Sequence, residues 1–338
     1  MKTKISRRSF IRSAALGLGA LSLAGCGNGS QNQAAGDKTD KITLVLDYVP
    51  NTNHTGIYVA QAKGYYKEKG IELEIQQPPE DGADALVASG RAQFGIGYQG
   101  FMANYLASDN PLPVLAVAAI LQHNTSGIMS AKDTNITRFR DMEHHSYASW
   151  NSPQELATLK YCVQKDGGNW DEVEIVPCNS TDEVSSLRAH EFDSIWVFEG
   201  WACQNAKLQD FKYNYLSFVD FDDVFDEYTP VLISSTHYLE DNSEQAKKFI
   251  EATRQGYEYA AAHPDEAAQI LCDQVPELDP ALIKLSQKFL SAQYVADAKS
   301  WGIIDPARWN RYYKWMYEQD IIPQEIGADV GFTMEYLD

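Results

Sequence analysis

Short apolar runs alternate with amphipathic stretches along the chain from residue 41 onward. The runs are rich in Val, Ile, Tyr and Phe and predict strands, whereas apolar residues spaced three or four apart predict helices between them. Strands that alternate with helices in this way favour parallel α/β sheets. The predicted strands cover residues 42–49, 71–76, 93–97, 114–120, 146–149, 173–176, 194–198, 213–219 and 231–234.

The predicted elements divide the chain into two similar units and a helical end. Residues 41–120 and residues 146–219 each show a strand–helix–strand–helix–strand pattern, which favours two α/β lobes over one doubly wound sheet. In such folds a ligand binds at the carboxyl ends of the strands and between the lobes. The predicted helices cover residues 56–69, 84–89, 153–166, 182–189, 200–208, 243–262, 265–273, 280–291 and 306–319.

The composition is that of an acidic globular protein. The 338 residues are 44% hydrophobic and carry a formal net charge of -19. This length allows two domains with cores of their own. The negative charge would repel phosphate backbones and anionic lipid headgroups, which argues against binding to nucleic acid or directly to a membrane surface.

The N-terminal segment has the features of an export signal and a spacer. Residues 6–11, SRRSFI, match a twin-arginine signature, and the apolar run of residues 14–24 is too short to span a bilayer of about 30 Å. The run leads into LAGC, which resembles the lipobox of bacterial lipoproteins. We therefore expect a signal peptide over residues 1–26, a lipid anchor on Cys26 and a flexible linker over residues 27–40. The protein would lie on the outer face of the cytoplasmic membrane, and a plain secretory signal with a coincidental cysteine is the alternative.

The remaining cysteine, histidine and acidic residues predict neither a metal site nor a cofactor. The pair His144 and His145 has no cysteine or paired acids at ligand spacing nearby. An acidic cluster at residues 222–227 lacks the calcium-loop pattern and is interpreted as a solvated surface. The cysteines show neither a C-x-x-C motif nor zinc spacing, so free thiols are expected and a disulfide stays open for Cys162, Cys178, Cys203 and Cys272.

The turn between the first strand and the first helix, LDYVPNTNHTG, carries more polar side chains than a helix cap requires. Pro50 fixes the backbone, and one Asn or Thr side chain is enough for a cap. The others are available to a ligand, because this turn lies at the carboxyl end of a strand. From the residues alone, ligand contact and capping stay equally open for Asp47, Tyr48, Asn51, Asn53 and His54.

The sequence that contains this turn resembles a known family. Residues 46–75, LDYVPNTNHTGIYVAQAKGYYKEKGIELEI, are similar to the first unit of the NMT1/THI5-like periplasmic binding proteins, in the branch that binds pyrimidine precursors of thiamin for ABC importers. The SGRAQFGI run at residues 89–96 fits the broader family pattern, and the resemblance extends over about residues 41–335. It implies a type II binding-protein fold, in which two α/β lobes joined by two crossover strands close on a small molecule.

The same resemblance implies the lobe limits and the partners. Lobe one would comprise residues 41–128 and 234–338, and lobe two would comprise residues 129–233. The protein would be a monomer that delivers its ligand to an ABC permease in the cytoplasmic membrane.

A glycine-rich segment follows the third predicted strand. Residues 95–100, GIGYQG, match the dinucleotide motif G-x-G-x-x-G, but residues 116–120, where an acidic residue is expected about 20 positions on, are apolar. We interpret the glycines instead as allowing a close approach of the backbone, so that Tyr98 and Gln99 face a ligand.

The second unit has a similar strand-to-helix turn at residues 198–201, FEGW. A carboxylate directly after an apolar strand is costly unless a partner satisfies it, and the amine of a 4-aminopyrimidine would be such a partner. We therefore expect Glu199 to be the polar anchor of the ligand, and a first-turn acid favoured by the helix dipole is the alternative.

Aromatic residues near these turns could stack on a flat ring. The candidates are Tyr48, Tyr98, Trp196 and Trp201, although each fits the core equally well. Trp196, in mid-strand, is the one most expected to be structural, and cleft or core stays open for it. Asn151, at the start of the first helix of lobe two, is a further candidate contact, although helix capping explains this segment equally well.

The resemblance leaves two other functions to weigh. The family includes an enzyme that makes the thiamin pyrimidine from its own histidine and a lysine-bound pyridoxal phosphate. Its reacting lysine and histidine would fall on Gly97 and Phe101, and its cysteine run near residues 226–230, so we expect no enzyme here. A sulfonate or nitrate site would need Arg or Lys in the cleft, but the arginines fall on predicted helix or loop faces. The resemblance therefore implies a formylamino or hydroxymethyl pyrimidine as the ligand, with a sulfonate, nitrate or another small heterocycle as the alternative.

Overall fold

The computed structural model describes residues 39–79, 82–178, 180 and 182–337. The predicted signal peptide, the predicted lipid anchor on Cys26 and all but the end of the predicted linker lie outside these residues. Within this part of the chain, no helix combines the length and the apolar character needed to cross a membrane.

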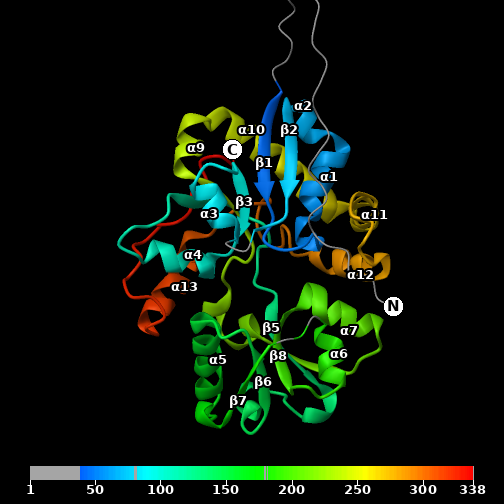
Figure 1. Cartoon of the computed structure of the whole chain (residues 1–338), viewed down its shortest axis with the longest axis vertical. Coiled ribbons are helices and arrows are strands. Elements are labelled where there is room, and N and C mark those ends of the chain that lie inside the picture. The colour runs from blue at the N-terminus through cyan, green and yellow to red at the C-terminus, as the bar shows by residue number, and fades with distance from the viewer. Residues whose placement is uncertain (1–38, 80–81, 179, 181, 338) are drawn as a thin grey trace, which may run out of the picture. The chain divides into compact units, whose positions relative to one another are not determined.

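The first sheet has five strands in the order β2-β1-β3-β10-β4 (Figure 1). β1 pairs in parallel with β2 and β3, and β10 runs antiparallel between β3 and β4. β1 and β3 therefore end at the same edge of the sheet, and the turns that follow them are neighbours. The strands are β1 (Asp40–Val45), β2 (Ile71–Gln76), β3 (Phe94–Gly97), β4 (Val114–Ala119) and β10 (Val231–Ser235).

The second sheet repeats this plan in the order β7-β6-β8-β5-β9. β6 pairs in parallel with β7 and β8, and β5 runs antiparallel between β8 and β9. The chain passes to this sheet after β4 and returns before β10, so the predicted fold of two α/β sheets with two crossing segments is confirmed. The strands are β5 (Ser126–Ala131), β6 (Ser146–Ser149), β7 (Glu174–Pro177), β8 (Ser194–Phe198) and β9 (Tyr213–Ser217).

The strand β5 is not predicted by the sequence pattern. Its residues, SGIMSA, are all buried, and four of the six are Ser, Gly or Ala, whereas strands favour β-branched and aromatic residues. Pairing on both edges and burial on both faces make it a central strand nevertheless. β5 begins at Ser126 and β10 begins at Val231, in each case a few residues before the predicted lobe limits at residues 128/129 and 233/234. These lobe limits stay a prediction.

The predicted helices are present, with one break at Gly64. This residue has a left-handed φ of 82° and divides the predicted helix over residues 56–69 into α1 and α2. The helices before β10 are η1 (Thr52–His54), α1 (Thr55–Lys63), α2 (Tyr65–Glu68), α3 (Gly82–Ala88), α4 (Gln99–Leu106), η2 (Lys132–Thr134), η3 (Phe139–Met142), α5 (Pro153–Lys165), η4 (Trp170–Glu172), α6 (Glu183–Arg188), the π-helix η5 (Glu199–Cys203), α7 (Gln204–Leu208), α8 (Phe218–Phe221) and η6 (Asp223–Phe225). After β10 follow α9 (Thr236–Asp241), α10 (Ser243–Ala262), α11 (Pro264–Gln274), α12 (Pro280–Leu290) and α13 (Pro306–Glu318).

The C-terminal helices pack against segments from both sheets. α10 packs against α1, and Phe249 stacks on Phe94 of β3 with ring centroids 4.0 Å apart. Trp315 of α13 lies edge-on to Phe225 at 5.0 Å and to Tyr161 of α5 at 5.6 Å. The helical end of the chain thus does more than cover the first sheet, because α13 also reaches elements of the second.

Gly127 in β5 gives a test of how tightly this unpredicted strand is packed. A Cβ added there would lie 2.3 Å from the carbonyl oxygen of Leu216 and 2.7 Å from the Tyr215 ring. We expect Gly127→Ala to lower the free energy of unfolding by about 2 kcal/mol, measured by urea unfolding, although alanine suits a strand better than glycine. The control is Gly327→Ala, whose Cβ would make an ordinary contact of 3.5 Å with Val330. Equal losses in the two variants would contradict the close packing of β5.

Candidate functional site

A cavity of about 750 Å³ lies between strand ends of the two sheets. Its wall comes from the turns after β1, β3, β6 and β8, from both crossing segments, from one residue of α6 and from one residue of α12. Small-molecule sites occupy about 300–1,000 Å³, and in α/β sheets they lie at the carboxyl ends of strands. The cavity therefore has the size and the position expected of a ligand site.

Asp47 organises the wall contributed by the first sheet. One of its carboxylate oxygens lies 2.6 Å from Nε2 of His54, and the other accepts a hydrogen bond from the Tyr98 hydroxyl. Nδ1 of His54 accepts the backbone N–H of Asn51 at 3.2 Å. The Asn51 side chain in turn caps the turn by accepting the N–H of Asn53 at 2.9 Å. These residues bind one another and hold the turn after β1 against the turn after β3.

The surroundings set opposite proton affinities for Asp47 and Tyr98. Burial alone would raise the pKa of the Asp47 carboxyl, but the interaction with His54 and the hydrogen bond from Tyr98 bring it below its ordinary value. Burial and the neighbouring Asp47 hold the pKa of the Tyr98 hydroxyl well above its ordinary value. Asp47 is thus a charged acceptor in the wall, and Tyr98 keeps its proton.

The structure brings most of the predicted ligand residues to the cavity. The wall includes Asp47, Tyr48, Asn51, Asn53, Tyr98 and Trp201. It does not include His54, Gln99, Asn151 or Glu199. Whether the six wall residues contact a ligand stays a prediction.

His54 and Gln99 have partners within the protein instead. His54 is fully buried behind Asp47. The Gln99 side chain donates from Nε2 to the carbonyl oxygen of Trp309 at 2.9 Å and accepts the N–H of Tyr228 at 2.8 Å. Both amide groups of Gln99 are therefore occupied, and this residue holds the second crossing segment to α4 and α13.

Glu199, the predicted anchor, is turned away from the wall. Trp196, Val197 and Phe198 all line the cavity, and Glu199 then begins the π-helix η5. Burial raises the pKa of the Glu199 carboxyl, and the charges that act on it come from Lys207 and Asp220, neither of which lines the cavity. Trp196, for which cleft and core stayed open, lines the cavity and also packs against the core, with its ring centroid 4.2 Å from that of Phe218.

Asn151 is also outside the wall, although it lies next to it in the sequence. The residue is exposed and has a left-handed φ of 62°. Its neighbours Trp150 and Ser152 line the cavity. The sequence thus predicted the correct turn but not the residues that face the cavity.

Glu155 is a cavity residue that the sequence interpretation missed. It is 2% exposed, and its carboxylate accepts the hydroxyls of Tyr147 at 2.6 Å and Ser149 at 2.9 Å. It also accepts the backbone N–H of Ser152 at 3.2 Å, which completes a capping box at the start of α5. The S-x-x-E spacing in NSPQE was the signal in the sequence.

Glu227, on the second crossing segment, is the other missed acid. Glu227 is 7% exposed and lines the cavity. Burial raises the pKa of its carboxyl to about 8, although hydrogen bonds from Tyr312 and from the backbone of Gly100 act in the opposite direction. At neutral pH Glu227 is therefore protonated, so that it can donate one hydrogen bond and accept another.

The amide of Gln154 lies beside Glu227. Its Nε2 donates to the Tyr312 hydroxyl at 2.6 Å, whereas its Oε1 is buried without a partner. Gly100 allows both side chains to approach α4, because a Cβ there would lie 2.2 Å from Gln154 Nε2 and 2.8 Å from Glu227 Oε2. The cavity thus contains an unused acceptor close to a neutral acid.

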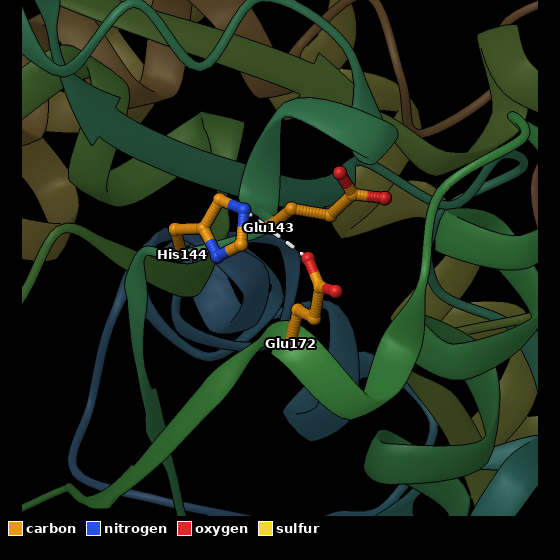
Figure 2. A group of neighbouring side chains, drawn as sticks. All are labelled: Glu143, His144 and Glu172. Atoms are coloured by element: carbon orange, nitrogen blue, oxygen red, sulfur yellow. Dashed lines mark ion pairs between the residues drawn. The ribbon is translucent and has the colours of Figure 1, made fainter.

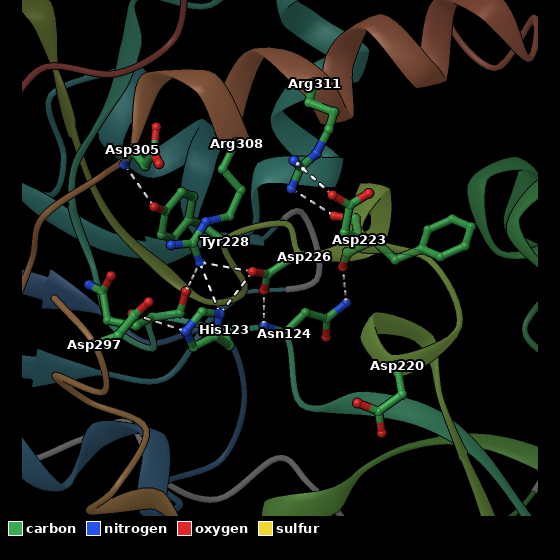
Figure 3. Close-up of polar contacts among 12 residues, drawn as sticks. His123, Asn124, Asp220, Asp223, Asp226, Tyr228, Asp297, Asp305, Arg308 and Arg311 are labelled. Atoms are coloured by element: carbon green, nitrogen blue, oxygen red, sulfur yellow. Dashed lines mark hydrogen bonds and ion pairs between the residues drawn. The ribbon is translucent and has the colours of Figure 1, made fainter.

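The acidic cluster at residues 222–227 is not simply the solvated surface that the sequence suggested, because Asp226 is only 9% exposed. Its carboxylate accepts the N–H of Asn124 at 3.1 Å and lies 2.8 Å from Nδ1 of His123 and 3.2 Å from Nη1 of Arg308 (Figure 3). A buried carboxylate needs such partners. This network ties the two crossing segments to each other and to α13.

The wall combines aromatic rings with carboxyl groups. Among the residues that the structure describes, the wall has no Lys, Arg or His side chain but four acids, Asp47, Glu155, Glu183 and Glu227. The aromatic members include Phe101 and Trp150, which are 50% and 49% exposed. This surface suits a flat ligand that donates hydrogen bonds, and it repels an anion.

The sequence model of the family described as NMT1/THI5 like matches residues 51–267, more than half of the chain. The chain belongs to the NMT1/THI5-like family. It is 26% identical over 324 residues to the formylaminopyrimidine-binding protein of Halalkalibacterium halodurans, and the alignment covers 94% of this chain and 96% of that protein. It is 22% identical over 317 residues to the 4-amino-5-hydroxymethyl-2-methylpyrimidine phosphate synthase of Aspergillus parasiticus, and the alignment covers 83% of this chain and 90% of that protein.

Solved structures share the fold of this NMT1/THI5-like chain at low identity. The periplasmic aliphatic sulphonate binding protein SsuA from Escherichia coli matches with a TM-score of 0.65 and 11% identity, over 85% of this chain and 95% of that chain. This likeness supports the arrangement of two α/β sheets around a cavity.

One group of possible metal ligands lies away from the cavity of this NMT1/THI5-like protein. The ligand atoms of Glu143, His144 and Glu172 lie within 4.8 Å of one another (Figure 2). His144 and Glu172 are exposed, and Nε2 of His144 lies 3.1 Å from Oε2 of Glu172. An ion pair at the surface accounts for this arrangement, and we assign no metal to it.

The cysteines whose pairing the sequence left open are free thiols. Burial raises the pKa of Cys162 well above its ordinary value and that of Cys203 to about 12. Thiols with such pKa values are poor nucleophiles. The free cysteines are Cys162, Cys178, Cys203 and Cys272.

The buried Glu227 predicts a pH dependence of stability. The ordinary pKa of a Glu carboxyl, expected in the unfolded chain, is 4.5, and the pKa of Glu227 in the folded protein is about 8. Between pH 4.5 and pH 8 the folded state therefore binds more protons than the unfolded state. The free energy of unfolding should therefore fall as the pH rises through this window, by about 1.4 kcal/mol per pH unit. We expect Glu227→Gln to remove this contribution, so that the variant gains stability relative to wild type as the pH approaches 8.

Urea unfolding of both proteins at several pH values in this window measures the effect. Glu174→Gln, at an exposed position in β7, is the control and should follow the wild-type curve. Parallel pH profiles for wild type and Glu227→Gln would show that Glu227 is ionised in the folded protein.

Proposed function

We propose that this chain is the solute-binding protein of an ABC importer and that it binds a pyrimidine precursor of thiamin, of the formylamino or hydroxymethyl type. The observation that carries this proposal is the cavity wall, which joins aromatic rings to four carboxyl groups and has no basic side chain among the described residues. A neutral, flat heterocycle with an amino group satisfies such a wall. A phosphate, sulfonate or nitrate would meet only negative or neutral groups.

Glu227 is the proposed anchor of the pyrimidine. A 4-aminopyrimidine presents an amine donor next to a ring nitrogen that accepts a hydrogen bond. A protonated carboxyl group matches this edge, because its carbonyl oxygen accepts from the amine and its hydroxyl donates to the ring nitrogen. The unpaired Oε1 of Gln154 is available to a further donor of the ligand after a small rearrangement.

The aromatic residues would hold the faces of the ring. Tyr48 and Phe101 come from the first sheet, and Trp150 and Phe198 come from the second. All four are substantially exposed, between 39% and 66%. A ligand that enters between them would bury this apolar surface and favour closure of the cavity around the ring.

The relatives support this choice of ligand over an anion. The Halalkalibacterium halodurans relative is named for formylaminopyrimidine binding and aligns along nearly the whole chain. SsuA is named for sulphonates, but its likeness is one of fold, at 11% identity. The absence of cations from the described cavity wall also weighs against a sulfonate.

A synthase activity has less support. At Gly97, where the resemblance places the reacting lysine, an added Cβ would lie 3.1 Å from Cγ2 of Ile233. The position of the reacting histidine is Phe101, at the rim of the cavity. Residues 226–230 read DEYTP and supply Glu227 to the cavity instead of a run of cysteines. These positions favour a binding protein over an enzyme.

Export, lipid anchoring and a monomeric state complete the proposal. The twin-arginine signature and the LAGC motif support a protein that is tethered through Cys26 outside the cytoplasmic membrane. In that position the protein would present its ligand to the permease.

Calorimetric titration of the purified full-length chain tests the ligand. We expect binding of formylamino or hydroxymethyl aminopyrimidine, and no binding of taurine or nitrate. Glu227→Leu should weaken pyrimidine binding by about 10- to 100-fold, because it removes a pair of hydrogen bonds to the ligand. Glu199→Gln is the matched control, since Glu199 is a half-buried acid outside the wall.

The outcomes separate the possible ligands and anchors. Binding of an anion without binding of pyrimidine would refute the proposed ligand and leave the fold intact. Loss of pyrimidine affinity in Glu199→Gln, with Glu227→Leu unchanged, would restore Glu199 as the anchor.

The lipid anchor has a separate test. We expect Cys26→Ala, expressed in a bacterial host, to move the protein from the membrane fraction to the soluble fraction, because the acyl chains can no longer be attached. Membrane fractionation followed by immunoblotting measures the distribution. Retention of the variant in the membrane fraction would contradict lipidation at Cys26.

A further inference from the structure

A buried serine of α12 connects the two halves of the cavity wall. Oγ of Ser286 lies 2.5 Å from Oγ1 of Thr52 in the turn after β1, and it donates to the carbonyl oxygen of Gly200 in the turn after β8. Ser286 has a single hydroxyl proton, which it gives to Gly200, so Thr52 is the donor of the other hydrogen bond. The result is a relay from the Thr52 hydroxyl through Ser286 to the Gly200 carbonyl.

The relay is closed to water and tightly packed. Ser286 is 0% exposed and Thr52 is 1% exposed. At Gly200 a Cβ would lie 2.8 Å from Cδ2 of Leu290, so that α12 approaches the backbone of the π-helix more closely than another residue at this position would allow. Thr52, Gly200 and Leu290 all line the cavity, whereas Ser286 does not.

Neighbouring groups from the C-terminal helices hold the same turn. The Tyr294 hydroxyl donates to the carbonyl oxygen of Thr52 at 2.6 Å, and the Tyr257 hydroxyl donates to that of Asn53 at 2.7 Å. α12 also packs against η1 on one side and against η5 and α7 on the other. α12 therefore contacts the turns at the ends of both β1 and β8, and Tyr257 of α10 and Tyr294 after α12 add support to the turn after β1.

We propose that Ser286 is a positioning residue, which holds the turn after β1 and the turn after β8 in a fixed relation and so keeps the ligand cavity assembled. Its effect on ligand binding rests on the proposed function, whereas its effect on the two turns does not. Without the Ser286 hydroxyl, the Gly200 carbonyl and the Thr52 hydroxyl each lose one hydrogen bond at buried positions. Each turn would then move to find another partner, and the cavity would lose its shape.

Ser286→Ala and a matched control test this role in the full-length chain. The control is Ser291→Ala, because Ser291 is also a buried serine near the end of α12 but contacts neither turn directly. Its hydroxyl donates to the backbone of Ala260 and Gln287 and accepts Nε2 of Gln287 at 3.0 Å. Hydrogen–deuterium exchange of residues 51–56 and 199–203, without ligand, reports on the two turns. We expect faster exchange in both turns for Ser286→Ala and in neither for Ser291→Ala.

Calorimetry on the same variants reports on the cavity. We expect Ser286→Ala to weaken pyrimidine binding by about tenfold, as for the loss of one buried hydrogen bond, and Ser291→Ala to bind as the wild type does. Thr52→Val is a second variant that breaks only the first step of the relay. It should speed exchange at residues 51–56 and leave residues 199–203 unchanged.

The outcomes distinguish this role from the proposed function. Unchanged exchange in Ser286→Ala, or an increase in one turn only, would overturn the positioning role. Faster exchange in both turns together with a wild type that binds no pyrimidine would refute the ligand and support the role of Ser286. Equal effects in Ser286→Ala and Ser291→Ala would show a general loosening of α12 and overturn the proposal.

Discussion

The burial of the Asp47 carboxylate is the constraint that shapes the first half of the site. A charge that is almost removed from water is tolerated only when hydrogen bonds and an opposite dipole or charge replace the water. His54 and Tyr98 provide these partners, and they come from the turns after β1 and β3. Because His54 also accepts the N–H of Asn51, the position of the whole turn depends on the same carboxylate. The clustered polar residues of this turn thus serve mainly to present Asp47 in a fixed orientation.

The second acid of interest, Glu227, is stabilised in the opposite way. Among the residues that the structure describes, no cation pairs with it, and burial keeps it protonated where Asp47 is ionised. Two carboxyl groups in one cavity therefore offer different hydrogen-bonding patterns at neutral pH. In an enzyme, such a difference would suit a pair of acid and base catalysts. In a binding protein it provides a donor as well as acceptors without any positive charge, which is what an aminopyrimidine requires and an anion does not.

The sequence predicted the elements well and the direction of side chains less well. The strands other than β5 and most of the longer helices follow from their apolar periodicity, whereas α8 and α9 are not among the predicted helices. β5 was missed because SGIMSA gains its stability from neighbours on both sides, not from its own residues. The turns at the cavity were also predicted, because strand ends and helix starts are visible in the sequence. Which residue of a turn lines the cavity depends on the exact residue at which the strand ends. Glu199 illustrates this, because it lies between the wall residues Phe198 and Gly200 but is not itself part of the wall. The protonation of Glu227 depends on its burial, and its hydrogen-bond partner Tyr312 is distant in the sequence, so local patterns carry no information about either.

The contacts of the C-terminal helices define where the two sheets can move relative to each other. Two arginines of α13 form ion pairs beside the second crossing segment, Arg308 with Asp226 and Arg311 with Asp223, the latter at 3.1 Å. Gln154 of α5 also donates a hydrogen bond to the Tyr312 hydroxyl of α13. At α12 the Ser286 relay adds another connection. Among the described residues, no such contact joins the exposed aromatic side chains of the two sheets at the rim of the cavity, Tyr48, Phe101, Trp150 and Phe198. A rotation that brings the sheets together would therefore change mainly the distances between these side chains. Under the proposed function, the cavity would close on a ring without disturbing its hydrogen-bonded interior, because the polar groups would stay in place while the aromatic residues of the two sheets approach each other.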